Sequence, residues 1–483
     1  FRSTPRAPRI TDYSEIPSPY LAGVFDPLIA AHPEHKWLGV WETNRGCPFT
    51  CAYCDWGSAN ASKVHHFDME RLRQEALWFA ANTVEFIFCC DGNFGMFKRD
   101  RDIAVMVASV KAEYGYPKAL SVQNTKNAAE RSFEIQEILS RAGLNKGVTL
   151  AMQTMNPEAL EHVGRQNIST QAFQELQSRF AAAKVETYTD LILALPGETY
   201  RSFVLGVSEI VAGGQHNRIQ FINLSILPNA HMGDPEYQRR HGMVTVESKV
   251  INIHGSLAVE DEYTAETQVL VVGTTTMPLE DWIRTRAFSW MTALLYFDKL
   301  LQIPMLLLQV RCGLACHVLV EAFLEADEAA PLLGEIRDFF FEQARAVSQG
   351  ATEYFGAPHC LGIFWPHDEY VFITLSCDGK LARFYREAGE ALARVCRSRL
   401  GQVPSFLADA VALNQALVKQ PFVREDSELR LEHDVYGAYR AALAGDAGDP
   451  GSRMDKPAAY RIHSKDPSWP SWEDWMRKVI WYG

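Results

Sequence analysis

From residue 45 to residue 57 the chain reads Arg45-Gly46-Cys47-Pro48-Phe49-Thr50-Cys51-Ala52-Tyr53-Cys54-Asp55-Trp56-Gly57, which gives the cysteine spacing Cys-x3-Cys-x2-Cys. Three thiolates on one short loop can hold three irons of a cubane [4Fe–4S] cluster and leave the fourth iron without a protein ligand. An open iron can chelate a small molecule, so the spacing predicts a catalytic centre. The alternative is structural zinc, which needs four ligands, and the nearest further candidates are His65 and His66.

Outward from this loop, strand-like runs alternate with helical patterns. The strand-like runs are Trp37–Trp41, Glu85–Cys90, Ala119–Gln123, Gly147–Gln153, Tyr188–Leu195 and Ile219–Ile226. Between them, stretches such as Met69–Asn82 and Phe133–Ala142 carry apolar residues at helical spacing. This alternation predicts an α/β fold, in which a parallel sheet with crossover helices is either open or part of a barrel. Catalytic groups are then expected at the carboxyl ends of the strands.

The sequence pattern predicts three parts. Residues 1–35 are rich in proline and are expected to be an extended connector, and residues 36–235 contain the strand–helix alternation. Residues 236–483 are expected to form a mixed α/β C-terminal domain that covers the substrate. Its helical patterns are Leu279–Leu301, Leu332–Ser348 and Leu381–Arg399, and its strand candidates are Met243–Val259, Leu361–Trp365 and Tyr370–Ser376.

The composition limits the classes of protein that fit. Of the 483 residues 47% are hydrophobic and 22% are charged, which is typical of a folded globular protein. The net charge of −12 argues against a protein that coats nucleic acid, so no nucleic-acid partner is expected. The most apolar stretch, near 305–310, is far shorter than the roughly 20 residues of a membrane span, so no membrane partner is expected.

The cysteine count and the first residue bear on location. Ten cysteines are too few for a disulfide scaffold of this size, and no charged-then-apolar leader follows Phe1. A cytoplasmic protein is therefore expected. Because the first residue is Phe1 and not Met, residues upstream of it are also expected.

Taken with the strand order, the cysteine loop resembles the signature of the radical SAM superfamily. The resemblance implies a partial (β/α)6 barrel with the cysteine loop after its first strand. It also implies that Cys47, Cys51 and Cys54 bind the cluster that cleaves S-adenosylmethionine (SAM), whose amino and carboxylate groups chelate the open iron. Reductive cleavage in that family yields a 5′-deoxyadenosyl radical, which abstracts hydrogen from the substrate, and the electron comes from an external donor such as flavodoxin or ferredoxin.

The resemblance implies further SAM contacts near the strand ends. Tyr53 occupies the aromatic place before the third cysteine, next to the adenine, and Asp91 stands where the family has an acid near the methionine amino group. The other expected contacts come from Asn124 and Lys126, from Gln153 and its neighbour Thr154, and from Leu195 in the segment Thr189–Thr199, whose backbone meets the adenine.

Several flanking segments resemble one branch of the superfamily, the cobalamin-dependent enzymes. These segments are Ile16–Gly23, Glu42–Cys47, Cys54–Gly57, Asp91–Gly95 and Leu227–Ala230. The resemblance implies a Rossmann-like cobalamin-binding domain upstream of the connector. It also implies a C-methyltransferase of natural-product biosynthesis, in which methylcobalamin delivers a methyl group to an unactivated carbon. The substrate would be a small molecule such as a carbapenam, or a peptide.

Two alternatives remain open at this point. One is a radical SAM enzyme without methyl transfer, such as a peptide epimerase or a ring-forming enzyme. The other is a binding protein stabilised by zinc or a cluster. The other clusters of cysteine, histidine and tryptophan are expected to be structural: Cys89 and Cys90, the pair Cys312 and Cys316 with His317, and the tryptophans from Trp469 to Trp481.

Overall fold

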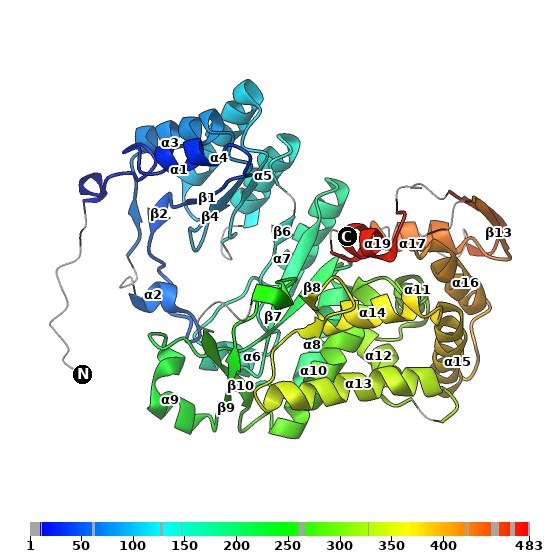
Figure 1. Cartoon of the computed structure of the whole chain (residues 1–483). Coiled ribbons are helices and arrows are strands. Elements are labelled where there is room, and N and C mark those ends of the chain that lie inside the picture. Colours follow the sequence, from blue (N-terminus) through cyan, green and yellow to red (C-terminus); the bar gives the residue numbers. More distant parts are fainter. Residues whose placement is uncertain are drawn as a thin grey trace. The chain divides into compact units, whose positions relative to one another are not determined.

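The computed structural model of the chain describes residues 10, 12–59, 63–125, 129–145, 147–259, 266–326, 328–420, 422, 425–445, 454–463 and 469–481. The chain folds into two units, whose helices and strands are labelled in Figure 1. Unit 1 consists of residues 1–152, 164–188 and 227–231, and unit 2 consists of residues 153–163, 189–226 and 232–483.

A parallel sheet of three strands forms the centre of unit 1. Its order is β1 (Leu38–Trp41), β4 (Phe86–Cys89) and β5 (Ala119–Ser121). The register places Leu38 opposite Phe86, and Phe88 opposite Ser121. The first three strands predicted from the sequence are therefore confirmed, with slightly shorter bounds.

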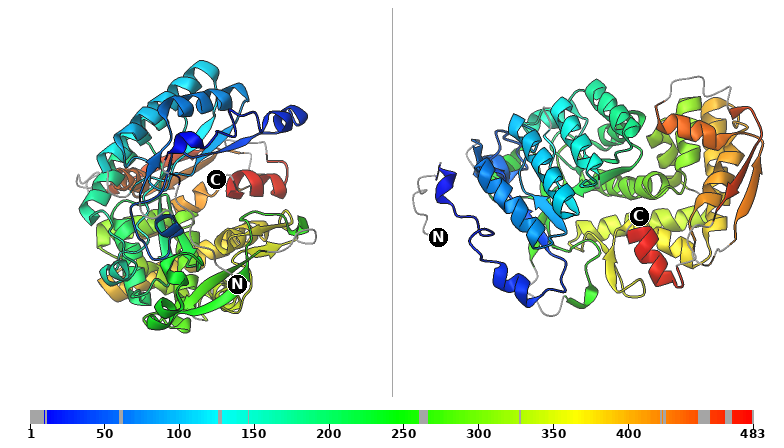
Figure 2. Two further views of the ribbon diagram at one scale, coloured as in Figure 1. Left: turned by 90° about the vertical axis from the view of Figure 1, so that its left-hand side faces the viewer. Right: turned by 90° about the horizontal axis from the view of Figure 1, so that it is seen from above.

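Three amphipathic helices pack on this sheet (Figure 2): α3 (Met69–Ala81), α4 (Lys98–Tyr114) and α5 (Ala129–Arg141). Their apolar residues share one core with the strands, in which Phe79, Ile87 and Val107 are fully buried. Helix α3 begins where the Asp68 carboxylate accepts hydrogen bonds from two backbone N–H groups. The other elements of unit 1 are η1 (Tyr13–Glu15), α1 (Asp26–Ala31), β2 (Asn44–Arg45), α2 (Asp55–Ala59), β3 (His65–His66) and α7 (Thr170–Ala182).

A second set of strands has the order β6 (Val148–Thr149), β7 (Thr187–Leu193) and β8 (Arg218–Asn223). Within unit 1, β6 pairs in parallel with the start of β7. Within unit 2, helix α8 (Tyr200–Ala212) connects the rest of β7 to β8. All six predicted strands occur in the predicted order, and among the described residues the two sets form separate sheets, as expected of a partial barrel.

Unit 2 is mixed α/β with helices predominating, and its long helices α10 and α13 run side by side (Figure 1). Its antiparallel pairs are β9 (Val244–Lys249) with β10 (Thr267–Gly273), β11 (Phe355–Ala357) with β12 (Ile363–Trp365), and β13 (Ser427–Leu431) with β14 (Ala458–Ile462). Its helices are α6 (Pro157–His162), α9 (Pro235–Arg240), α10 (Leu279–Thr292), α11 (Gln302–Cys312), α12 (Cys316–Leu324), α13 (Pro331–Ser348), α14 (His367–Cys377), α15 (Leu381–Leu400), α16 (Leu407–Leu417), α17 (Val435–Leu443) and α19 (Trp472–Trp475). Short 3₁₀ turns occupy η2 (His231–Gly233) and η3 (Leu257–Val259), and π-helical turns occupy η4 (Ala293–Phe297) and η5 (Met476–Trp481).

Among the strand candidates of residues 236–483, Met243–Val259 is too long, because only Val244–Lys249 form a strand, and one other candidate is wrong. Residues Tyr370–Ser376 belong to helix α14 and not to a strand. The segment is short and rich in β-branched and aromatic residues, and Val371, Phe372 and Ile373 are all buried, so its hydrophobic pattern carries no helical period. Burial on several sides therefore overrides the local strand propensity.

The groups expected to be structural are packed in the cores. Cys89 and Trp475 are fully buried, and Cys316 is almost so. His317 shares a hydrogen bond of 2.8 Å with the Ser208 hydroxyl. The burial of Cys316 and the contact of His317 agree with a structural role in unit 2.

No single helix in the described part of the chain is long and apolar enough to cross a membrane. One bent pair, Leu279–Phe297 with Gln302–Cys312, passes the same test of length and composition. Both members of this pair are mostly buried inside unit 2.

Candidate functional site

The cysteine loop lies in unit 1 between β2 and α2. Cys47 and Cys51 are 7% and 8% exposed, and Cys54 is partly exposed. A turn brings the second and third cysteines together, since the Cys54 N–H donates to the Cys51 carbonyl oxygen (3.0 Å). All ten cysteines are described and none forms a disulfide.

Two glycines fix the path of this loop. Gly46 has φ +117°, and a β-carbon there would lie 2.1 Å from the Lys63 carbonyl oxygen. Gly57 is in equally close contact, because its β-carbon would lie 1.9 Å from the Phe49 carbonyl oxygen. Both clashes are with backbone atoms, so the loop cannot keep this conformation with any larger residue at either position.

Asn93 contacts the loop directly and was missed from the sequence. Its side-chain N–H group donates to the Cys47 sulfur over 3.1 Å, and both side chains are buried. A hydrogen bond to a ligand sulfur stabilises the thiolate and tunes the reduction potential of a cluster that it binds. The only sequence signal was that Asn93 lies in the segment Asp91–Gly95, which resembles the cobalamin-dependent branch.

The three cysteine sulfurs are not gathered as closely as the ligands of a single zinc ion would be. In the described residues, only one group of three metal-binding side chains has its ligand atoms within 4.8 Å of one another, and it does not include the cysteines. Three sulfurs on one tetrahedral zinc would lie about 3.8 Å apart. His65 and His66 lie on β3, where the His65 ring is tilted against Tyr13 and the His66 ring meets Phe97 edge to face.

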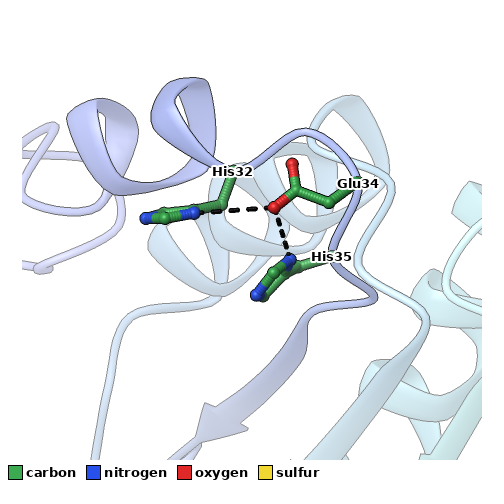
Figure 3. Close-up of side chains that lie close together, drawn as sticks. All are labelled: His32, Glu34 and His35. Atoms are coloured by element: carbon green, nitrogen blue, oxygen red, sulfur yellow. Dashed lines mark ion pairs between the residues drawn. The ribbon is translucent and has the colours of Figure 1, made fainter.

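The group that does gather is His32, Glu34 and His35 (Figure 3). The Nδ1 atoms of the two histidines lie 3.6 and 2.9 Å from one Glu34 carboxylate oxygen. All three side chains are exposed, and they are near neighbours in the sequence. Their closeness therefore follows from the chain itself and involves no other part of the fold.

Asp91 follows β4 and is completely buried. One of its carboxylate oxygens accepts from the backbone N–H groups of Thr43 (2.8 Å) and Asn44 (3.2 Å), and the other accepts from their side chains. Asp91 thus ties the end of β4 to the start of the cysteine loop. A SAM amino group at this carboxylate would have to share oxygens that already accept four hydrogen bonds.

Burial raises the pKa of Asp91 from 3.8 to about 6, and the hydrogen bonds from Thr43 and Asn44 only partly oppose this rise. A raised carboxyl pKa means that this group stabilises the fold most below pH 4 and that its contribution is lost as the pH rises through 6. We expect Asp91→Asn to remove this dependence, which amounts to about 2 kcal/mol between pH 4.5 and pH 7. Urea unfolding of the metal-free protein at pH 4.5 and pH 7 measures it; equal pH dependence in variant and wild type would contradict the prediction.

Tyr53 is held by a second residue that the sequence did not reveal. Arg165 donates to the Tyr53 hydroxyl (3.0 Å) and to Asn167 Oδ1 (2.8 Å), and it also donates to the Ala151 carbonyl oxygen. Arg165 is 8% exposed, and no carboxylate of the described chain forms an ion pair with it. No local motif marks Arg165, because 112 residues separate it from Tyr53.

Asn124 also lies in unit 1. It forms a parallel bridge with Phe94, and its side chain accepts from Gln136 (2.7 Å) and donates to the Thr149 carbonyl oxygen (3.4 Å). It therefore connects the end of β5 to α5 and β6. Lys126 lies outside the described residues.

The candidates that follow β6 and β7 lie in unit 2. Gln153 pairs with Leu191 in a parallel bridge, and Leu195 is completely buried after β7. Backbone angles of φ +66° at Gln153, +60° at Ala194 and +91° at Gly197 show an unusual concentration of left-handed conformations, which typically accompany functional sites.

Glu198 holds this segment together. Its buried carboxylate accepts hydrogen bonds from the hydroxyls of Thr154 and Ser202, and burial raises its pKa. The structure thus brings the cysteines, Tyr53, Asp91 and Asn124 into unit 1, and Gln153 and Leu195 into unit 2.

Comparison with known proteins agrees with this geometry. Residues 41–205 match the Radical SAM superfamily. The chain is 40% identical over 286 residues to the cobalamin-dependent radical SAM methyltransferase TokK of Streptomyces tokunonensis. These aligned residues cover 59% of this chain and 42% of TokK. It is also 40% identical over 279 residues to the 2-(S-pantetheinyl)-carbapenam-3-carboxylate methyltransferase of Streptantibioticus cattleyicolor. These aligned residues cover 57% of this chain and 40% of that protein.

Among solved structures, the methyltransferase TsrM of Kitasatospora setae with cobalamin and a [4Fe–4S] cluster bound is 15% identical, with a TM-score of 0.38. That similarity covers 64% of this chain and 61% of TsrM. The matches to the two curated relatives span about two fifths of their lengths.

Proposed function

We propose that the protein is a cobalamin-dependent radical SAM C-methyltransferase that methylates an unactivated carbon of a natural-product intermediate, because residues 41–205 match the Radical SAM superfamily. The observation that carries the proposal is the Cys-x3-Cys-x2-Cys loop in a chain that is 40% identical, over 286 and 279 residues, to a cobalamin-dependent radical SAM methyltransferase and to a carbapenam methyltransferase. The substrate is a small molecule such as a carbapenam, or a peptide. The proposed parts of the chain are the connector (residues 1–35), the radical SAM barrel (residues 36–235) and the C-terminal domain that covers the substrate (residues 236–483).

In this proposal Cys47, Cys51 and Cys54 bind three irons of the cluster, and the cofactors supply the radical and the methyl group. The residues of the chain bind and orient. Asn93 stabilises the Cys47 thiolate, and Tyr53 packs beside the adenine in the position that Arg165 sets. With no carboxylate partner among the described residues, the Arg165 guanidinium is a further candidate to pair with the SAM carboxylate.

The remaining assignments follow the same family pattern. Asp91 orients the loop entry and stands near the methionine amino group, while Asn124, Lys126 and Gln153 serve the ribose and the carboxylate. The backbone at Leu195 serves the adenine. An external one-electron donor such as flavodoxin or ferredoxin completes the system, which we place in the cytoplasm.

Methyl transfer is tested with full-length protein reconstituted anaerobically with iron, sulfide and hydroxocobalamin. We expect about four irons and one bound cobalamin per chain. After reduction with SAM that carries a deuterated methyl group, mass spectrometry should find 5′-deoxyadenosine and the deuterated methyl group on cobalamin. Four irons without bound cobalamin would remove the methylcobalamin mechanism and favour the alternative, a radical SAM enzyme that abstracts hydrogen without transferring methyl.

A further inference from the structure

A cavity of about 380 Å³ lies within unit 2, among helices α11, α14, α16 and α17. We call it the Asp298 cavity; its walls include Arg218, Phe297, Asp298, Glu369, Phe372 and Leu417. This volume is in the range of small-molecule sites. Its lining combines an apolar surface with a few charged groups, as such sites usually do.

The charged end of the cavity has more acceptors than donors. Arg218 donates to Asp298 Oδ1 (2.7 Å) and to Asp368 Oδ2 (3.2 Å), while Glu369 pairs with His254 (2.8 Å). The other buried guanidinium nearby, that of Arg286, donates to the Phe221 carbonyl oxygen.

Asp298 Oδ2 is left without a partner. Its side chain is only 8% exposed, and no donor among the described residues lies within hydrogen-bond distance of this oxygen. Burial raises the pKa of Asp298, because the ionised carboxylate is incompletely compensated. A buried acceptor without a donor is costly, so a ligand that turns this carboxylate toward the cavity and brings a donor would relieve the cost.

The wall that carries Asp298 is unusual and firmly held. The π-helical turn η4 ends one residue before Asp298, and Lys299 has φ +64°. The Asn414 side chain fixes this bend by donating to the carbonyl oxygens of Lys299 (2.7 Å) and Leu300 (2.9 Å) and by accepting from the Ile303 N–H (3.0 Å). Strained backbone and π-turns that are held in this way cluster at functional sites.

The cavity is not the candidate SAM site of unit 2. Arg218 is the first residue of β8, so the cavity adjoins the amino end of that strand. Gln153 and Leu195 lie beside and beyond the carboxyl half of β7. Helix α8 joins β7 to β8, and a helical crossover of this kind connects parallel strands. The two sites therefore lie at opposite ends of these strands.

We propose that the Asp298 cavity is a second small-molecule site, which binds a ligand whose protonated amine donates to Asp298 and Glu369 while its apolar body packs on Phe297 and Phe372. The site does not depend on the proposed methyl transfer. Its acceptors select a cation, and the exposed Lys299 and Lys419 at its walls disfavour a second positive group.

The test uses three probes of equal chain length: hexylamine, 6-aminohexanoate and hexanoate. Isothermal titration calorimetry on the full-length protein should detect binding of both amines and none of hexanoate. Asp298→Asn removes the charge, and Leu417→Trp fills the cavity from a position that is 42% exposed. Each substitution should weaken the binding of hexylamine at least about tenfold. Asp338→Asn, the same substitution at a surface acid, should leave binding unchanged.

Each other outcome overturns the proposal. If hexanoate binds as well as hexylamine, the lysines define an anion site. If hexylamine binds Leu417→Trp or all the variants as well as it binds the wild type, the interaction is non-specific. If hexylamine does not bind the wild type, the cavity does not recognise amines. Because Leu417 takes no part in the Arg218 ion pairs, this variant keeps the test decisive even if Asp298→Asn fails to fold.

Discussion

Cys51→Ala is expected to lose both the cluster and SAM cleavage. The variant keeps only two of the three thiolates on the loop, and two ligands cannot hold three irons of a cubane. Iron after anaerobic reconstitution should fall from about four per chain to less than about one. Formation of 5′-deoxyadenosine, measured by chromatography after reduction with SAM, should fall to the level of denatured protein.

Cys312→Ala is the matched control, because Cys312 is a partly exposed thiol of unit 2 that lies outside the loop. It should retain the iron content and the SAM cleavage of the wild type. Deoxyadenosine formation by Cys51→Ala at the wild-type rate would overturn the assignment of the cluster ligands. Loss of iron in both variants would point to a general effect of cysteine removal.

Gly57→Ala should displace the cysteine loop although it adds a single methyl group. The new β-carbon would lie 1.9 Å from the Phe49 carbonyl oxygen, and backbone cannot yield as a flexible side chain does. We expect a loss of about 1–3 kcal/mol in the free energy of unfolding, measured with urea on the metal-free protein. Reconstituted iron and deoxyadenosine should both decrease strongly, because the displaced segment includes Cys51 and Cys54.

Gly389→Ala is the control for this prediction. Gly389 lies within helix α15, where the added β-carbon would meet only Val411 at 3.8 Å, an ordinary contact. Alanine there should keep or slightly raise stability, because it is the better helix former. Normal iron binding by Gly57→Ala would show that the loop tolerates a shift at Phe49.

The predictable parts of the fold are those written locally in the sequence. The cysteine spacing and the six apolar strand runs each lie within about ten residues, so periodicity and spacing were sufficient to find them. Helix α14 was mistaken for a strand because Val371, Phe372 and Ile373 are buried on several sides, which erases the helical period. Its helical state is fixed by tertiary packing.

The supporting contacts of the site were beyond sequence reasoning for a related reason. Asn93 reaches Cys47 across 46 residues, and Arg165 reaches Tyr53 across 112. Neither pairing leaves a spacing that a single sequence displays. The likeness of Asp91 to a family acid suggested a role toward SAM, but its four hydrogen bonds to Thr43 and Asn44 emerge only from the fold.

We propose that Cys47, Cys51 and Cys54 hold a [4Fe–4S] cluster whose fourth iron is open to SAM. The most direct measurement is the electron paramagnetic resonance spectrum of the reconstituted, reduced protein before and after SAM is added. We expect a [4Fe–4S] signal whose g-values change when SAM binds the open iron. A signal that SAM leaves unchanged, or a protein that retains zinc and shows no cluster signal, would contradict it.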